Sequence, residues 1–143
     1  MKKTNNKGFS LVELIVVIAI MAVLIGVLAP QFTKYVEQSR RSTDIQNAEA
    51  IKTAVLADIA DGTIDTNQTT EEVKSGGFCP SAIAPAEIPT IQGKDNKDDN
   101  FTVTCDVVAG TCQVFAGGVD LTDPTLAAAY KAGTKEEEKK DSE

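Results

Sequence analysis

The sequence predicts an α+β fold in which one long N-terminal helix, hydrophobic in its first half, packs on a small antiparallel β-sheet of three or four strands. An apolar segment, 14–29, lies near the N-terminus and contains no charged residue. A helical pattern of apolar residues follows it to about Asp61, and two later segments alternate between apolar and polar residues. Helical periodicity followed by strand periodicity is typical of an α+β domain.

Residues 9–29 have the length of a membrane-spanning helix. As a helix these 21 residues extend about 31 Å, and the hydrocarbon core of a bilayer is about 30 Å thick. Lys2, Lys3 and Lys7 precede them, which favours a cytoplasmic N-terminus. A secretory signal peptide is an alternative, but its small-x-small cleavage site is missing before Pro30. A plain membrane anchor is a second alternative, and it does not explain the acidic Glu13.

The junction between the basic residues and the apolar segment carries a specific motif. Its sequence resembles the class III leader junction of type IV pilins, type II secretion pseudopilins and competence pseudopilins, and it reads Lys7-Gly8-Phe9-Ser10-Leu11-Val12-Glu13-Leu14. The resemblance implies the type IV pilin fold. It also implies that a prepilin peptidase cleaves between Gly8 and Phe9 and methylates the new N-terminal Phe9.

The same resemblance assigns assembly roles within the helix. It implies that Glu13 neutralises the terminal amine of a neighbouring subunit, and that the helix around Gly26 and Pro30 often unwinds in the assembled filament. The electrostatics agree, because a buried amine and a buried carboxylate are each costly alone and satisfy each other as a pair. Such a pair would also fix the axial register between subunits, as buried polar residues do in coiled coils.

These observations divide the chain into four parts. Residues 1–8 are the expected cleaved leader, and 9–30 are the transmembrane and assembly half of the helix. Residues 31–133 form the globular head, which includes the amphipathic half of the helix. Residues 134–143 are almost wholly charged, which predicts a disordered tail.

Local signals predict the helices of the head. The amphipathic half of the long helix carries one apolar stripe, made of Ile45, Ala48, Ile51, Val55, Leu56 and Ile59. The residues Thr69-Thr70-Glu71-Glu72 match a capping box, which predicts a short helix ending at Gly76. Asp123 followed by Pro124 predicts a last helix that runs to Ala132 and stops at Gly133.

Strand periodicity predicts a β-hairpin from segments 101–107 and 112–114. One face collects Phe101, Val103, Cys105 and Val107, and the facing strand presents Cys112, Val114 and Ala116. Two registers preserve this facing: a two-residue turn pairs Val107 with Cys112, and a four-residue turn pairs Cys105 with Cys112. The pattern does not choose between them.

The three cysteines predict one disulfide and one free thiol if the head is exported. Cys105 with Cys112 is the local pairing, and Cys79 with either partner is the alternative. Buried, unreactive thiols are the other interpretation. A metal site is not expected, since three cysteines without a histidine lack the usual paired spacing.

Composition excludes several functions. Without residues 1–8 the chain has 11 basic and 21 acidic residues, a net charge of −10, which argues against nucleic-acid binding. There is no histidine, no nucleophile–base pair and no phosphate-binding loop, so an enzyme is not expected. No cofactor is expected either. Calcium at the oxygen-rich segment 95–100 is a weaker alternative to a solvated hairpin loop.

The resulting hypothesis is a structural subunit that polymerises with copies of itself into a surface filament for adhesion, motility or aggregation. The resemblance implies three further partners: the prepilin peptidase, an assembly platform protein and an ATPase. The subunit would lie in the cytoplasmic membrane before assembly and on the cell surface afterwards. One alternative is a pseudopilin of a type II secretion or DNA-uptake system. The other is a membrane-anchored binding module that does not polymerise.

Overall fold

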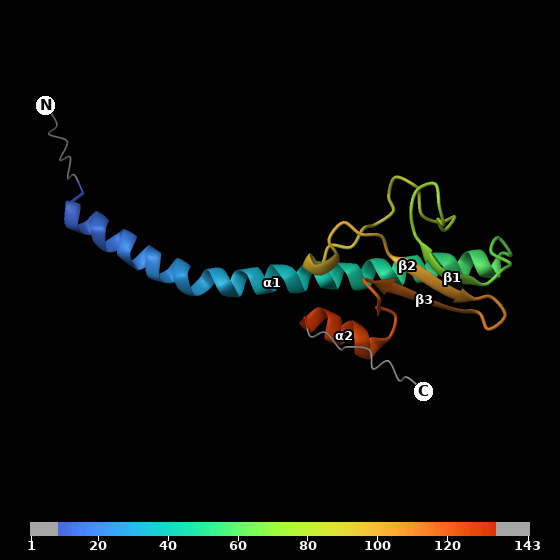
Figure 1. The fold of residues 1–143 in the computed structure, drawn as a ribbon. Helices are drawn as coiled ribbons and strands as arrows, with labels where there is room; N and C mark the ends of the chain where they lie inside the picture. The colour runs from blue at the N-terminus through green and yellow to red at the C-terminus, as the bar shows by residue number, and fades with distance from the viewer. Residues whose placement is uncertain (1–8, 134–143) are drawn as a thin grey trace, which may run out of the picture. The chain divides into compact units, whose positions relative to one another are not determined.

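The computed structural model describes residues 9–133, which comprise two units, 9–36 and 37–133. Residues 1–8, the predicted leader, and residues 134–143, the predicted disordered tail, lie outside the described residues. The first unit is helical. The second unit contains the sheet and the second helix, and it is called the head below (Figure 1).

The long helix α1 runs from Leu11 to Ala60 and belongs to both units. It begins two residues after and ends one residue before the predicted limits. At its C-terminal end the amides of Thr63 and Ile64 donate to the carbonyl oxygen of Asp58, and Gly62 adopts a φ of 75°. A left-handed glycine after the last turn is a common helix stop.

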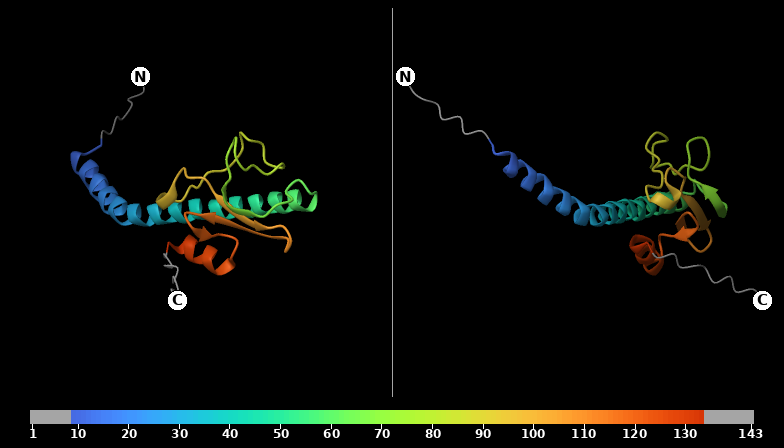
Figure 2. Two further views of the ribbon diagram at one scale, coloured as in Figure 1. Left: turned by 45° about the vertical axis from the view of Figure 1, so that its right-hand side comes forward. Right: turned by 60° about the vertical axis from the view of Figure 1, so that its left-hand side comes forward.

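The head contains one antiparallel sheet with the strand order β1-β2-β3-β4. Its strands are β1 (Gln68–Glu72), β2 (Thr102–Asp106), β3 (Thr111–Ala116) and β4 (Val119–Asp120). The views in Figure 1 and Figure 2 agree that β2 and β3 lie along the second half of α1. The predicted α+β fold, a long helix on a small antiparallel sheet, is confirmed.

The β2–β3 hairpin adopts the register with the four-residue turn. Cys105 is directly opposite Cys112, and Asp106 opposite Thr111. Oδ1 of Asp106 accepts hydrogen bonds of 3.0 Å from the amides of Val108 and Ala109, and Gly110 takes a φ of 63°. An aspartate that bonds the turn's own amides and a left-handed glycine both favour this longer loop over a two-residue turn.

The short strand β4 is positioned by a tight turn at Gly117 and Gly118. Both glycines have positive φ, 58° and 86°, and the pairing of Ala116 with Val119 leaves only these two residues in the turn. Such a turn requires left-handed backbone at both central positions, which glycine adopts without strain.

Helix α2 (Pro124–Ala132) follows β4 and matches the prediction at both ends. Oδ1 of Asp123 accepts hydrogen bonds from the amides of Thr125 and Leu126, and Gly133 closes the helix with a φ of 80°. The two amide hydrogen bonds lower the pKa of Asp123. These contacts supply partners for backbone groups that a helix leaves unpaired at its ends.

The helix predicted from the capping box at 69–72 was wrong. These residues lie in β1, which pairs with β2 through an irregular register, and Thr70 takes a φ of 54°. A helix of so few residues is only marginally stable in water. Strand pairing instead supplies hydrogen-bond partners along the free edge of β2, and it places Val73 in the core.

The core lies between the second half of α1 and one face of the sheet. The predicted stripe of α1 contributes Ala48, Ile51 and Val55 as fully buried residues, with Ile45, Leu56 and Ile59 partly buried at its border. The predicted face of the hairpin is also confirmed, except that Val107 lies in the turn. Further core residues that the pattern did not identify are Val73, Ile91, Leu121 and Tyr130.

Candidate functional site

The first turn of α1 carries the acidic residue that the sequence singled out. Oε2 of Glu13 accepts a hydrogen bond of 2.8 Å from the amide of Ser10, just before the helix. This is the side-chain-to-backbone half of a capping box, with Glu13 at the third helical position. The carboxylate therefore lies over the N-terminus of its own helix, where a negative charge is also favoured by the helix dipole.

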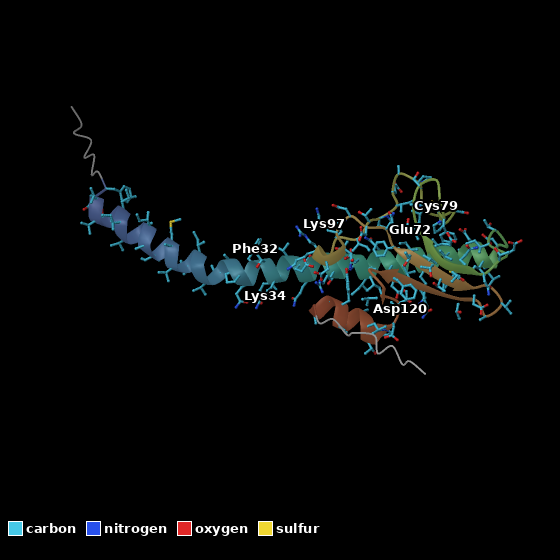
Figure 3. All side chains as sticks on the ribbon, viewed as in Figure 1. Phe32, Lys34, Glu72, Cys79, Lys97 and Asp120 are labelled. Carbon is cyan, nitrogen blue, oxygen red and sulfur yellow. The ribbon has the colours of Figure 1, made fainter. Side chains whose placement is uncertain are left out.

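The apolar side chains of this segment surround α1 on all sides. Phe9 is 93% exposed, and every large hydrophobic residue from Leu11 to Leu28 is at least half exposed. Figure 3 shows these side chains radiating from the helix. Among residues 9–133, α1 is the one helix long and apolar enough to cross a membrane. A helix that is apolar all round needs lipid or other protein as its surroundings.

Gly26 and Pro30 are one helical turn apart within this unit. Secondary structure stays helical through both residues. Proline has no amide hydrogen, so Pro30 cannot donate to the carbonyl of Gly26, four residues earlier. Glycine is itself a weak helix former, so the two residues lower helix stability at the same point. The geometry is compatible with local unwinding in that turn.

A cluster of polar residues in the head was not identified from the sequence. Arg41 of α1, with a side chain 11% exposed, makes three hydrogen bonds: Nε to Glu37 at 2.9 Å, Nη1 to the carbonyl of Tyr130 at 2.7 Å and Nη2 to Asp95 at 2.8 Å. Its guanidinium also lies over the Tyr130 ring, 5.2 Å from the centroid. Arg41 thereby joins α1, the end of α2 and the loop before β2.

Asp44, one turn further along α1, is fully buried and accepts three hydrogen bonds. They come from the amides of Gln92 and Gly93, at 2.7 and 2.8 Å, and from the hydroxyl of Tyr130, at 2.8 Å. Burial and the hydrogen bond to Asp44 both raise the pKa of Tyr130, so its hydroxyl remains a donor. The cluster consists of Glu37, Arg41, Asp44, Asp95 and Tyr130, and it holds loop and helix on α1.

The cysteines separate into a pair and a single thiol. Cys105 and Cys112 face each other across β2 and β3 with a distance of 2.7 Å between their sulfur atoms, as free thiols. Cys79 lies in the loop after β1, half buried, and its thiol contacts the carbonyl of Ile83 at 3.4 Å. Of the pairings considered from the sequence, the local one is brought together.

The oxygen-rich segment 95–100 is partly engaged by protein groups. Asp95 binds Arg41, Asp98 lies 3.4 Å from the ammonium of Lys97, and the Asn96 side chain packs against Gly117. Within residues 9–133 no cluster of three or more histidine, cysteine or acidic side chains is arranged to hold a metal ion. Calcium binding at segment 95–100 stays a prediction from the sequence.

Comparison with known proteins bears on the N-terminal segment first. Residues 3–29 match the family model of the prokaryotic N-terminal methylation motif. The chain is 35% identical to the prepilin peptidase-dependent protein A of Clostridium perfringens over 74 residues. This alignment covers 52% of this chain and 53% of that relative. The chain therefore spans about half the length of this relative.

Two further relatives align over most of the chain. One is a fimbrial protein of Pseudomonas aeruginosa, 28% identical over 117 residues, which cover 80% of this chain and 76% of the relative. The other is the type IV narrow pilus major component PilA5 of Thermus thermophilus, 28% identical over 114 residues, which cover 78% and 89%. No solved structure matches the chain significantly.

A long apolar N-terminal helix, an antiparallel sheet and the methylation motif define the class of N-terminally anchored, prepilin-like α+β proteins. The motif and the named fimbrial relatives take the assignment one step further. The chain carries the prokaryotic N-terminal methylation motif and is similar over most of its length to fimbrial and type IV pilus proteins.

Proposed function

We propose that this protein is the structural subunit of a type IV pilus. A prepilin peptidase cleaves between Gly8 and Phe9, and the new terminus is N-methylated. Before assembly the subunit lies in the cytoplasmic membrane, with its head on the side away from the cytoplasm. An assembly platform protein and an ATPase then add it to a filament made of copies of itself. The role is structural, and it agrees with the fimbrial and pilus names of the relatives.

One observation carries the proposal: the first part of α1, residues 11–29, presents an apolar surface on all sides that contains a single carboxylate, at Glu13, in its first turn. In a filament, neighbouring helices would cover the apolar side chains and remove them from water or lipid. Glu13 would meet the amine of Phe9 from a neighbouring copy, since each charge is costly in an apolar environment without the other. Its present partner, the amide of Ser10, leaves other carboxylate lone pairs available.

The test examines the N-terminus and the location of the protein in its native host. Filaments sheared from the cell surface are sequenced, and the expected first residue is N-methyl-Phe9. The variant Gly8→Val, which places a β-branched side chain at the cleavage site, is expected to keep its leader and to be missing from the sheared fraction. Thr4→Ala is the matched control within the leader and is expected to behave as the wild type. Functional filaments that retain Met1 would refute the proposal.

The same fractionation addresses the pseudopilin alternative. A protein that is processed at Phe9 but confined to the cell envelope, with a transport defect on deletion, would identify a pseudopilin. The pilin assignment is preferred because the relatives that align over most of their length are named as a fimbrial protein and a pilus major component. A protein that keeps its leader and stays monomeric would instead be a simple membrane anchor.

A further inference from the structure

The two buried cysteines of the head lie directly opposite each other on neighbouring strands, an arrangement that allows a cross-strand disulfide. Cys105 and Cys112 are direct partners in the register of β2 and β3, and both side chains point to the buried face. Directly opposed residues of an antiparallel pair have Cβ atoms about 4.5–5.5 Å apart, and the Cβ atoms of a disulfide are about 3.5–4.5 Å apart. A small approach of the two strands is therefore enough to form the bond. Their sulfur atoms already lie in contact, at 2.7 Å.

The third cysteine is held elsewhere. The thiol of Cys79 contacts the carbonyl oxygens of Pro80 and Ile83 within its own loop, at 3.7 and 3.4 Å. The neighbouring loop backbone is fixed to α1, because the amide of Ser81 donates to Asp58 at 2.7 Å. Pairing Cys79 with either sulfur of the hairpin would therefore require breaking these contacts and opening the close contact between Cys105 and Cys112.

We propose that Cys105 and Cys112 form a disulfide across the β2–β3 hairpin, made before the head closes over them, and that Cys79 remains the only thiol. The inference rests on the proposed function in one respect, since it needs the head to lie outside the cytoplasm, where disulfides persist. Each thiol loses a proton, and the two electrons reduce the disulfide of a thiol–disulfide oxidant to two thiols. One sulfur–sulfur bond forms in the head, and one sulfur–sulfur bond of the oxidant is broken.

The order of events follows from burial. The two side chains are only 3% and 4% exposed in the folded head. Burial raises the pKa of both thiols. Since the thiolate is the attacking species, a closed head offers neither access nor a nucleophile to an external oxidant. The bond must therefore form while the hairpin is still open, and it should resist reductants afterwards.

The first experiment counts thiols in the full-length protein isolated from its host without reductant. The protein is unfolded in urea, alkylated with a maleimide and analysed by intact mass and by peptide mapping. Wild type is expected to gain one adduct, on Cys79. Cys79→Ser should gain none, and Cys105→Ser should gain two. Three adducts on the wild type, or a disulfide-linked peptide that contains Cys79, would overturn the pairing.

The second experiment tests the order of events and separates this inference from the proposed function. Dithiothreitol is expected to open the bond at least about tenfold more slowly in native buffer than in urea, because reduction then requires the head to open. Equal rates would overturn the claim that the bond is sealed. Digestion of the head by protease added to intact cells reports export independently. An exported head with three thiols would refute the disulfide and leave the pilin proposal intact.

Discussion

The hydroxyl of Tyr130 on α2 donates a hydrogen bond of 2.8 Å to Oδ2 of Asp44, a fully buried carboxylate on α1. The two residues are 86 positions apart in the sequence. Together with the amides of Gln92 and Gly93, the tyrosine gives this carboxylate three donors. A buried charge without partners would cost several kcal/mol, so this arrangement makes the position of α2 depend on a polar residue of α1.

Removing the tyrosine hydroxyl should weaken the head less than removing the carboxylate. Tyr130→Phe leaves Asp44 with its two backbone donors, and a loss of about 1–2 kcal/mol in the free energy of unfolding is expected. Asp44→Ala leaves two amides and a hydroxyl without a partner in the core, and a loss of about 3 kcal/mol or more is expected. Pulse proteolysis in urea measures both. An Asp44→Ala head as stable as the wild type would contradict this account.

Gly93 should tolerate no side chain. A Cβ built there would lie 2.5 Å from the hydroxyl oxygen of Tyr130 and 3.0 Å from Oδ2 of Asp44. Gly93→Ala is therefore expected to break the hydrogen bond between them and to cost about 1–3 kcal/mol, measured by the same proteolysis. Gly77→Ala is the control, because its Cβ would meet only the flexible side chain of Lys74. A cost at Gly77 as large as that at Gly93 would argue against a specific clash.

The sequence predicted the architecture because the decisive signals are local. The apolar segment, the stripe of α1, the alternation in β2 and β3 and the caps of α2 each lie within a few residues. The cluster around Asp44 was missed, although the sequence contains a signal for it. Asp44 is four residues before the buried Ala48, and Arg41 is three residues before Asp44, so both charged residues continue the buried stripe of α1. Charged residues at buried stripe positions indicate buried polar partners, yet the partners themselves come from loops and from α2, which no local pattern identifies.

The errors in the strand assignment have the same physical origin. The pair Gly117-Gly118 between two apolar residues is a hairpin signal, and it could have located β4. For β1 the local signal was misleading, because a capping box describes only how a helix would begin. The free edge of β2 determines its conformation, and that edge is about thirty residues away along the chain.

Arg41→Lys should be damaging although it keeps the charge. The planar guanidinium reaches Glu37, Asp95 and the carbonyl of Tyr130 at once, and an ammonium group cannot reproduce that geometry. We expect a loss of about 1–3 kcal/mol in the free energy of unfolding. Arg40→Lys, on an exposed neighbouring position, is the control and should change stability by less than about 0.5 kcal/mol. Equal effects of the two variants would show that the fork geometry is unimportant.

The lowered pKa of Glu37 predicts that the free energy of unfolding depends on pH. Its partial burial opposes ionisation, but hydrogen bonds from the amide of Lys94 and from Arg41 outweigh burial, so its pKa lies below the ordinary value of 4.5. The folded state therefore favours the ionised form. This contribution is present above about pH 5 and is lost as the pH falls through the folded-state pKa. The stability difference between wild type and Glu37→Gln should shrink toward about pH 3. The pKa of Asp123 is also lowered, but its contribution is the same in both proteins and cancels in the difference. A stability difference between wild type and Glu37→Gln that does not change with pH would refute the role of Glu37.

Glu13→Gln separates the two roles of this side chain. The glutamine amide oxygen can still accept the hydrogen bond from the amide of Ser10, so the start of α1 should be preserved. It has no charge to pair with the amine of a neighbouring Phe9, so that amine would be buried without compensation during assembly. We expect normal levels in the membrane and at least about a tenfold loss of sheared filaments, since 1.4 kcal/mol of lost pairing already corresponds to tenfold. Glu49→Gln, on an exposed position of the same helix, should assemble normally. A Glu13→Gln protein that assembles normally would leave Glu13 with only its capping role.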